Sequence, residues 1–404
     1  LDGSGNFGIG TSSPTQELEI KFDTDKHMLF SDSQGETGNC PSIHTVNTAG
    51  SALVEFGIRA SEIRLATGSA KRMVLDDNSR ISLSNNDGGG TGGNASTSAN
   101  TLLGYGIADM DDGSISNTLI GHRVAGNGSH ADMTNNTGVG NLALFYVSSG
   151  DNNTALGSVA LHSLTTGSNN VAVGKSPGAS LTSGSNNTIV GRLTADALTT
   201  GSSNIAIGDS ALGTATTATL NVAIGGDSMS LVPASVAIQD VVAIGQNAFK
   251  GSSSTTDGAN GSVAVGRDSL KVVSSGGKNV AVGYLAGSQI TTGNSNVALG
   301  HQAMDEITTG DRNIAIGHNS IGNAQGGSTS GGSKDNIAIG FQSQGGAWSD
   351  VECNKNVSIG SYSLDGAMNG ALQNTAIGYG SLGAVTQGDN NVAIGMEAGD
   401  SITT

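Results

Sequence analysis

Residues 153–170 of this chain read NTALGSVALHSLTTGSNN, and the first five letters belong to a motif, Asn-(Val/Ile/Thr)-Ala-(Ile/Val/Leu)-Gly, of which seventeen variants occur along the chain. Ten of the sixteen intervals between successive motif glycines are 17 residues. A fixed short period over most of a chain is typical of a solenoid, in which each repeat packs mainly on its neighbours. The motif glycines are Gly104, Gly121, Gly140, Gly157, Gly174, Gly191, Gly208, Gly225, Gly245, Gly266, Gly283, Gly300, Gly317, Gly340, Gly360, Gly378 and Gly395.

One repeat predicts one rung of a parallel β-roll. Residues 154–156 predict a short strand that ends at Gly157, residues 160–164 predict a second strand, and residues 165–168 predict the turn back. The long apolar stripe of a helix, with its 3.6-residue period, is absent. We therefore expect an all-β parallel β-solenoid with rungs of about 17 residues over residues 91–404, on the order of 80 Å long at the strand spacing of a β-sheet.

The positions of one rung, counted from the motif glycine as 0, predict different roles. Position −2 is Ala in twelve of the seventeen repeats, which indicates room for little more than a methyl group. Position −1 is always Ile, Val or Leu, and we expect this row to form the core. Position +1 varies freely and is expected to face solvent, with His301 and His318 stacked on adjacent rungs but without a metal ion.

Position −4 is Asn in fifteen of the seventeen repeats, with Val241 and Ser262 as the exceptions. Identical amides on successive rungs can hydrogen-bond as a ladder and satisfy the turn backbone, so we expect a structural row rather than a metal or sugar site. The row in the regular repeats comprises Asn153, Asn170, Asn187, Asn204, Asn221, Asn279, Asn296 and Asn313.

Longer intervals between glycines predict loops at residues 229–240, 250–261, 322–335 and 342–355. Solenoids accept insertions at turns, commonly on a binding face. The last loop holds the single tryptophan, Trp348, beside Asp350 and Glu352. An exposed indole there would stack on a sugar or anchor a partner, whereas the alternative is that it plugs a gap between subunits. Asp257 is a further candidate receptor contact.

Composition excludes several classes of protein. The chain has 404 residues, 64 Gly without a three-residue period, 12% charged residues and a net charge of −16. Collagen and disorder are disfavoured, and no basic stripe or long apolar run suggests nucleic-acid binding or membrane insertion. Cys40 and Cys353 lie too far apart in sequence to suggest a disulfide framework or a metal knuckle, so both are expected to be ordinary buried or half-buried thiols. No cofactor is expected.

Residues 1–90 lack the 17-residue frame and predict a small β-rich module. Residues 53–59 and 62–65 are expected to pair as strands, and residues 1–9 are echoed by residues 75–83. The chain starts without Met and ends in a sequence that matches the start of the recurrent Thr-Thr-Gly turn. We therefore expect the roll to continue beyond Thr404.

Two segments of this module resemble a known class of protein. Residues 5–14, GNFGIGTSSP, resemble a GNVGIGTTSP segment that recurs in tail fibres of bacteriophages, marine ones especially, and residues 71–76, KRMVLD, resemble the ERMRID that precedes it there. The roll is similar to the head repeats of YadA-like trimeric autotransporter adhesins in its Asn-x-Ala-Ile-Gly core, although its period is longer. The resemblance implies a homotrimeric extracellular fibre, intertwined or side by side, with a left-handed roll.

The predicted function is a structural fibre of a phage virion that projects from the particle and supports attachment to the host. Its partners would be two further copies of itself, other virion proteins and a host-surface glycan or protein. The alternative is a trimeric adhesin on the bacterial outer surface.

Two further classes of function fit the sequence less well. A glycan-cleaving enzyme needs two carboxylates in a cleft, but Asp109, Asp111 and Asp112, or Asp350 and Glu352, sit in turn-like segments, so we expect no enzyme. Ice binding would need a regular Thr array, and pairs such as Thr165–Thr166 are missing from many rungs.

Overall fold

The computed structural model describes residues 7–9, 11–12, 18–23, 26–32, 41–46, 62–67, 70–76, 81–83, 100–107, 114–127, 133–322, 332–348 and 351–404. The chain divides into two compact units, Leu1–Ser79 and Arg80–Thr404. Within the described ranges both units are predominantly β, and a short 3-10 turn, η1 (Asp257–Ala259), lies in one of the long turns.

The first unit contains two small sheets. The first has the order β1-β2-β3-β4, in which β1 pairs with β2 in parallel and the other pairs are antiparallel. The second is a hairpin of β5 and β6. Residues 53–59, expected to pair with 62–65, lie outside the described residues, and β5 pairs with β6. The bounds are β1 Phe7–Ile9, β2 Leu18–Asp23, β3 Lys26–Asp32, β4 Pro41–Val46, β5 Glu62–Thr67 and β6 Ala70–Asp76.

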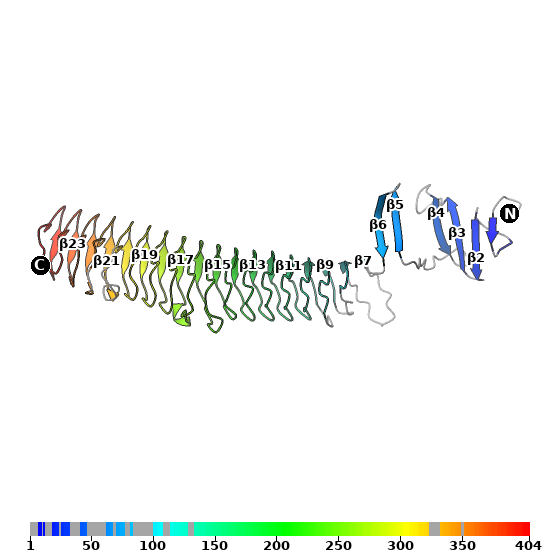
Figure 1. The fold of residues 1–404 in the computed structure, drawn as a ribbon, viewed down its shortest axis with the longest axis horizontal. Helices are drawn as coiled ribbons and strands as arrows, with labels where there is room; N and C mark the ends of the chain where they lie inside the picture. The colour runs from blue at the N-terminus through cyan, green and yellow to red at the C-terminus, as the bar shows by residue number, and fades with distance from the viewer. Residues whose placement is uncertain are drawn as a thin grey trace. The chain divides into compact units, whose positions relative to one another are not determined.

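The second unit is a parallel β-solenoid, as the repeat predicts. After β7 (Ile81–Leu83), which pairs antiparallel with β8, seventeen three-residue strands pair in chain order, parallel and in register (Figure 1). The bounds are β8 Thr101–Leu103, β9 Thr118–Ile120, β10 Thr137–Val139, β11 Thr154–Leu156, β12 Val171–Val173, β13 Thr188–Val190, β14 Ile205–Ile207, β15 Val222–Ile224, β16 Val242–Ile244, β17 Val263–Val265, β18 Val280–Val282, β19 Val297–Leu299, β20 Ile314–Ile316, β21 Ile337–Ile339, β22 Val357–Ile359, β23 Thr375–Ile377 and β24 Val392–Ile394.

Each rung contains one strand, and the expectation of a second strand at residues 160–164 is wrong. Val159 and Leu161 have φ angles of 64° and 48°, in the left-handed region, so this segment turns instead of extending. It still stacks on its neighbours, because the Leu161 N–H donates to the carbonyl oxygen of Pro177 on the next rung at 3.1 Å. The turn therefore follows the repeat without forming a strand.

The core row is position −2, and the expectation that position −1 forms the core is also wrong. Ala155 and Ala172 at position −2 are fully buried, whereas Leu156 at position −1 is 36% exposed. Successive residues of a strand point to opposite faces, so positions −3 and −1 both face outward. The interior opposite the strand is filled by residues such as Leu161 and Leu164, which leaves space for a methyl group.

Larger residues at position −2 are matched by a glycine nearby, so the interior of each rung is filled to a similar extent. Ile189 replaces Ala at position −2, and the residue at position +4 of the preceding rung is Gly178, where an added Cβ would lie 2.9 Å from the Ile189 Cδ1. Leu119 at position −2 is followed by Gly138 in the next rung, where an added Cβ would lie 3.1 Å from the Leu119 Cδ2. A large side chain is thus accommodated by a neighbouring glycine, as close packing requires.

The motif glycine is required by both conformation and space. All seventeen have φ between 124° and 145°, a region that side chains disfavour. A Cβ added to Gly157 would also overlap the carbonyl oxygen of Gly174 on the next rung. The glycine row therefore permits the close stacking of successive rungs.

Candidate functional surfaces

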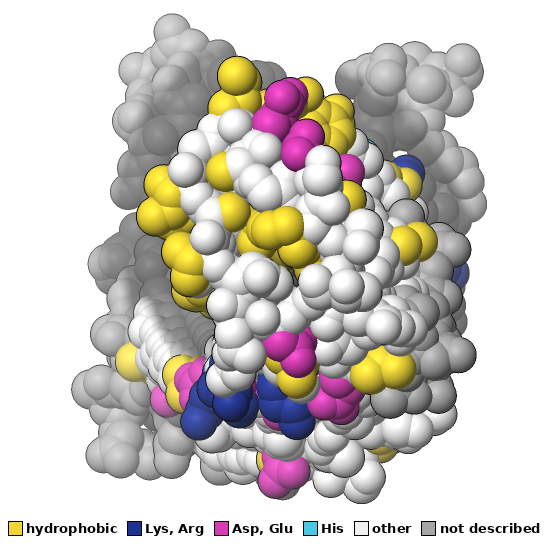
Figure 2. All heavy atoms as spheres, turned by 90° about the vertical axis from the view of Figure 1, so that its left-hand side faces the viewer, with side chains coloured by type: hydrophobic (Ala, Val, Ile, Leu, Met, Phe, Trp, Pro, Cys, Tyr) yellow, Lys and Arg dark blue, Asp and Glu magenta, His cyan; other side chains and the backbone are white. Residues whose placement is uncertain are grey.

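The outer sheet face, which we define as positions −3 and −1 of strands β8–β24, is the most extensive exposed apolar feature of the roll. Position −3 holds only Thr, Val and Ile, and position −1 holds only Ile, Val and Leu, so the face has no charged residue in either row. Val171, Ile205 and Leu299 are 38%, 40% and 40% exposed. Figure 2 shows hydrophobic side chains at the surface of the C-terminal end of the roll. In the last strand there, Ile394 is 69% exposed.

This arrangement is unusual for a parallel sheet, because such sheets normally have both faces covered. Here one face packs on the interior of the roll, and the chain itself leaves the other open. Contiguous exposed apolar surface of this kind marks sites of protein association. The outer sheet face is therefore the main candidate interface of the molecule.

The Asn row forms an internal ladder of hydrogen bonds on either side of two exceptions, Val241 and Ser262. The Nδ2 of Asn187 donates to the Oδ1 of Asn170 and to the carbonyl oxygen of Gly201, each at 3.0 Å. Its Oδ1 accepts from the backbone N–H and the Nδ2 of Asn204. The same pattern links the other buried asparagines of the row. These amides are fully engaged inside the roll, so they offer no surface for a metal ion or a sugar.

Two rungs lack the asparagine, but at each of them a hydrogen bond to the adjacent rung is kept. At the first, the backbone N–H of Val241 still donates to the Oδ1 of Asn221 at 3.0 Å. At the second, the Ser262 Oγ accepts from the backbone N–H of Asn279 at 3.3 Å. Both interruptions lie beside the loops at 229–240 and 250–261, so the ladder breaks where the rungs lengthen.

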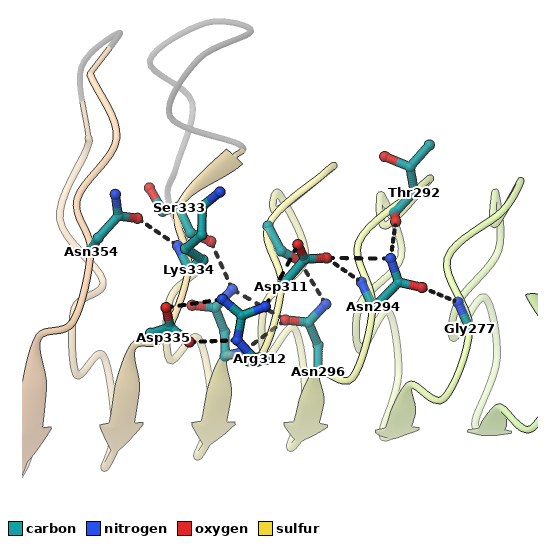
Figure 3. Close-up of polar contacts among 12 residues, drawn as sticks. Gly277, Thr292, Asn294, Asn296, Asp311, Arg312, Ser333, Lys334, Asp335 and Asn354 are labelled. Carbon is teal, nitrogen blue, oxygen red and sulfur yellow. Dashed lines mark hydrogen bonds and ion pairs between the residues drawn. The ribbon is translucent and has the colours of Figure 1, made fainter. Parts of the chain in front are cut away.

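A second ladder occupies the turn beside the 322–335 loop (Figure 3). The backbone N–H of Gly277 donates to the Oδ1 of Asn294 at 2.9 Å, and that of Asn294 donates to the Oδ1 of Asp311 at 2.8 Å. Arg312 contacts both carboxylate oxygens of Asp335, at 2.7 and 3.0 Å. These polar side chains hold successive rungs together, as does the Thr165 hydroxyl, which donates to the Thr182 carbonyl oxygen at 3.0 Å.

Ring side chains stack along position +1, as expected for adjacent rungs. The ring centroids of His301 and His318 are 4.8 Å apart with an interplanar angle of 10°. Tyr284 and Phe341 extend the stack at 5.2 Å on either side. Within the described ranges, no group of three His, Cys, Asp or Glu residues could hold a metal ion. The stack therefore contributes contacts between rungs.

The expectation that Trp348 is exposed is wrong. The indole is 1% exposed and belongs to the hydrophobic core, whereas the preceding Ala347, at position +7, is exposed. Leu164 occupies position +7 in a regular rung and is buried. Trp348 therefore fills the interior in place of that leucine. Its Nε1 has no hydrogen-bond partner among the described residues.

The other candidate contacts have different positions. Asp257 is exposed, in η1. Glu352 is half-buried and accepts a hydrogen bond from the Asn354 Nδ2 at 3.2 Å. Asp350 lies outside the described residues, as do Asp109, Asp111, Asp112 and Cys40. Cys353 is buried, and burial raises the pKa of its thiol.

Sequence reasoning did not identify three partly buried acids, Asp196, Asp305 and Asp365, each at position +5 of its own rung. Burial raises the pKa of Asp305 to about 7, with the nearby Glu306 carboxylate as a further cause. Burial also raises the pKa of Asp365 to about 6 and that of Asp196 above its usual range. Other rungs carry residues such as Phe145, His162 and Lys250 at this position, so an alignment of the repeats gives no signal for a shared acid.

No protein-family model matches this chain, and no curated protein matches it. In the part of the chain that the structure describes, no helix is long and apolar enough to span a membrane.

Proposed function

We propose that this chain is part of the shaft of a homotrimeric extracellular fibre of a phage virion, which supports attachment to the host surface. The observation that carries the proposal is the outer sheet face, two uncharged rows that are partly or fully exposed along seventeen strands in a single chain. Covering this face with two further copies would remove the exposed aliphatic side chains from water, at about 25 cal/mol for each Å² buried. Three identical chains would also present three copies of any receptor contact, which increases avidity.

The stacking of the rungs supports a mechanical role. Backbone hydrogen bonds join each rung to the next along the roll, and the Asn row and the ring stack add side-chain contacts between many of the rungs. The segments at residues 5–14 and 71–76 favour a virion over the cell-surface adhesin, because they resemble segments of phage tail fibres. As a shaft protein, the chain would act without catalysis or a cofactor.

Contact with the host is assigned to the long turns. The rungs leave their inward residues in the core and their Asn row in hydrogen bonds, so the regular repeats offer few adaptable groups. The 250–261 loop is one of these turns, and it presents Asp257 on η1. Trp348 is not part of this surface, because it is buried.

The oligomeric state tests the proposal. Light scattering of the intact chain should give about three times the monomer mass of 39.9 kDa. A double variant of the outer sheet face, Ile207→Lys with Ile224→Lys, should dissociate the trimer, because two lysines per chain would be buried without partners. The matched control is Thr166→Lys with Thr200→Lys, at exposed turn positions, which should remain trimeric. A soluble wild-type monomer would refute the proposed assembly.

The attachment function needs a separate test on assembled virions. Replacing residues 250–261 by the shorter turn of a regular rung should leave the trimer intact and lower adsorption to host cells. Unchanged adsorption would assign this loop to the shaft alone.

A further inference from the structure

We propose that a polar core cluster, Ser343, Gln344, Ser358 and Ser363, determines which rungs of the roll stack on each other. During folding it favours the native pairing of the rung of Gly340 with the rung of Gly360. The inference rests on the buried contacts of these four side chains and is independent of the oligomeric state.

A repetitive roll has a register problem. Position −2 is Ala in twelve of the seventeen rungs, position −4 is Asn in fifteen, and position +4 is apolar or Gly in all but one. If one rung looped out, the rungs on either side of it would meet with nearly the same contacts. Register is weakly specified wherever alternative pairings bury the same groups. Some residues must therefore make the native stack differ from the slipped one.

The polar core cluster makes such a difference. The Gln344 Nε2 donates to the Ser358 Oγ at 3.0 Å and to the Ile337 carbonyl oxygen at 3.1 Å. The Ser343 Oγ lies 2.5 Å from the Ser358 Oγ and 3.1 Å from the Ser363 Oγ. All four side chains are fully buried. The contacts therefore join two successive rungs through the interior.

Two members of the cluster are the polar exceptions in otherwise apolar rows. Ser358 is the one polar residue at position −2, and Gln344 is the one polar residue at position +4. If the rung of Gly360 looped out, Gln344 would face Ala376 instead of Ser358. A buried amide without its partner is unfavourable, so this slipped stack is penalised.

The polar core cluster is not expected to make the folded protein more stable than apolar residues would. The Gln344 Oε1 has no hydrogen-bond partner among the described residues, although the side chain is fully buried. Replacing partly satisfied buried polar groups by well-packed apolar ones is often neutral or stabilising. The location fits a role in register, because the glycine intervals on either side of Gly340 are 23 and 20 residues, so the repeat is least regular here.

The test replaces the two exceptions by the consensus residues, Gln344→Leu with Ser358→Ala, and measures register after refolding. Two reporter pairs at position +1 are introduced separately. Phe341→Cys with Ser361→Cys lies on adjacent rungs, whose spacing allows a disulfide, whereas Phe341→Cys with Tyr379→Cys can close only if the intervening rung has looped out. Full-length chains are refolded, oxidised with glutathione disulfide and mapped by mass spectrometry, which distinguishes the reporters from Cys40 and Cys353.

The consensus variant should raise the ratio of slipped to native disulfide by about fivefold to thirtyfold, the range expected for one lost specific polar contact. The matched control Ser320→Ala should not change the ratio, because its hydroxyl donates only to Gly317 within its own rung.

A rescue variant separates register from general damage. Adding Leu364→Gln and Ala376→Ser to the consensus variant moves the cluster one rung further, where Ser363 and Ser381 already provide the hydroxyl groups at position +3. The ratio should return to within about twofold of wild type if one polar contact again selects the neighbour. An unchanged ratio in the consensus variant, or a failure of the moved cluster to restore it, would overturn the proposal.

Discussion

The Oδ1 of Asn187 accepts two hydrogen bonds from Asn204, one from the backbone N–H and one from the Nδ2, each at 3.0 Å. The two residues are 17 positions apart in the chain and occupy the same site on adjacent rungs. This contact is the unit of the Asn row, and it makes each rung depend on the next. Because contacts of this kind join nearest neighbours, a substitution should weaken the roll locally before it unfolds the whole.

Replacing Asn187 by Ala should destabilise the roll by about 2–4 kcal/mol, because the change leaves the Gly201 carbonyl oxygen and two donors of Asn204 without partners. Hydrogen exchange of the neighbouring rungs, together with denaturant unfolding, measures the loss. Thr188→Val on the same rung is the control and should be nearly neutral, since other rungs carry Val at that position. Equal effects of the two variants would contradict a structural role for the row.

Replacing Gly174 by Ala should cost about 3 kcal/mol or more, because the residue has φ of 135° and an added Cβ would overlap the carbonyl oxygen of Gly191. The control is Gly226→Ala, at position +1, where the nearest contact of an added Cβ is 4.0 Å away. That variant should differ from wild type by less than about 0.5 kcal/mol in chemical unfolding. A tolerated alanine at Gly174 would show that the rungs can separate without cost.

Trp348→Ala should destabilise the protein by about 3–5 kcal/mol, because it removes a fully buried indole. Trp348→Phe should cost less, since the lost Nε1 has no hydrogen-bond partner among the described residues. As Trp348 is the single tryptophan, its fluorescence provides an independent measurement. Strong quenching of the native emission by acrylamide would contradict the buried position.

Stability should fall as the pH rises from about 4 to about 7, because burial raises the folded-state pKa of Asp305 to about 7 from 3.8. A group with a raised pKa binds its proton more tightly in the folded state, so folding is favoured while that proton is bound. Ionisation at higher pH then removes this contribution. Asp305→Asn should flatten the pH dependence of the melting temperature over this window.

A second variant separates the effect of burial on the pKa of Asp305 from the effect of the neighbouring charge. Glu306→Gln removes the neighbouring negative charge but leaves the burial of Asp305, which is the larger cause. The pH dependence should therefore become weaker without disappearing. A dependence that is identical in wild type and in Asp305→Asn would refute the assignment, since Asp365, with a pKa of about 6, would then have to account for all of it.

Much of the fold follows from the period alone. Equal spacing of the motif places residues such as Ala155 and Ala172 side by side, which predicts parallel strands in register and the ladder of asparagines. Stacking of His301 on His318 follows from the same spacing. These features depend only on the length of the repeat, so they can be predicted from the sequence without knowing how the chain closes each rung.

The length of the repeat does not predict which strand positions point into the roll and which point outward. Hydrophobicity favours Ile and Leu for the core, yet Ala155 is buried and Leu156 is partly exposed. The reason is the width of the rung, because the leucines on the opposite wall leave only a narrow space facing the strand. Trp348 also lies in the interior of the roll. The long interval between glycines had instead suggested an exposed loop at this point.

The sequence by itself determined the repeat, the parallel stacking and the need for glycine at the end of each strand, because all three depend on local conformation and spacing. Only the tertiary structure decided that position −2 lines the interior and positions −3 and −1 form the outer sheet face. That choice depends on which side of a three-residue strand the chain closes over. Closure is a property of the whole rung, in which the bulk of residues such as Leu161 and Leu164 is matched to the methyl group of Ala155.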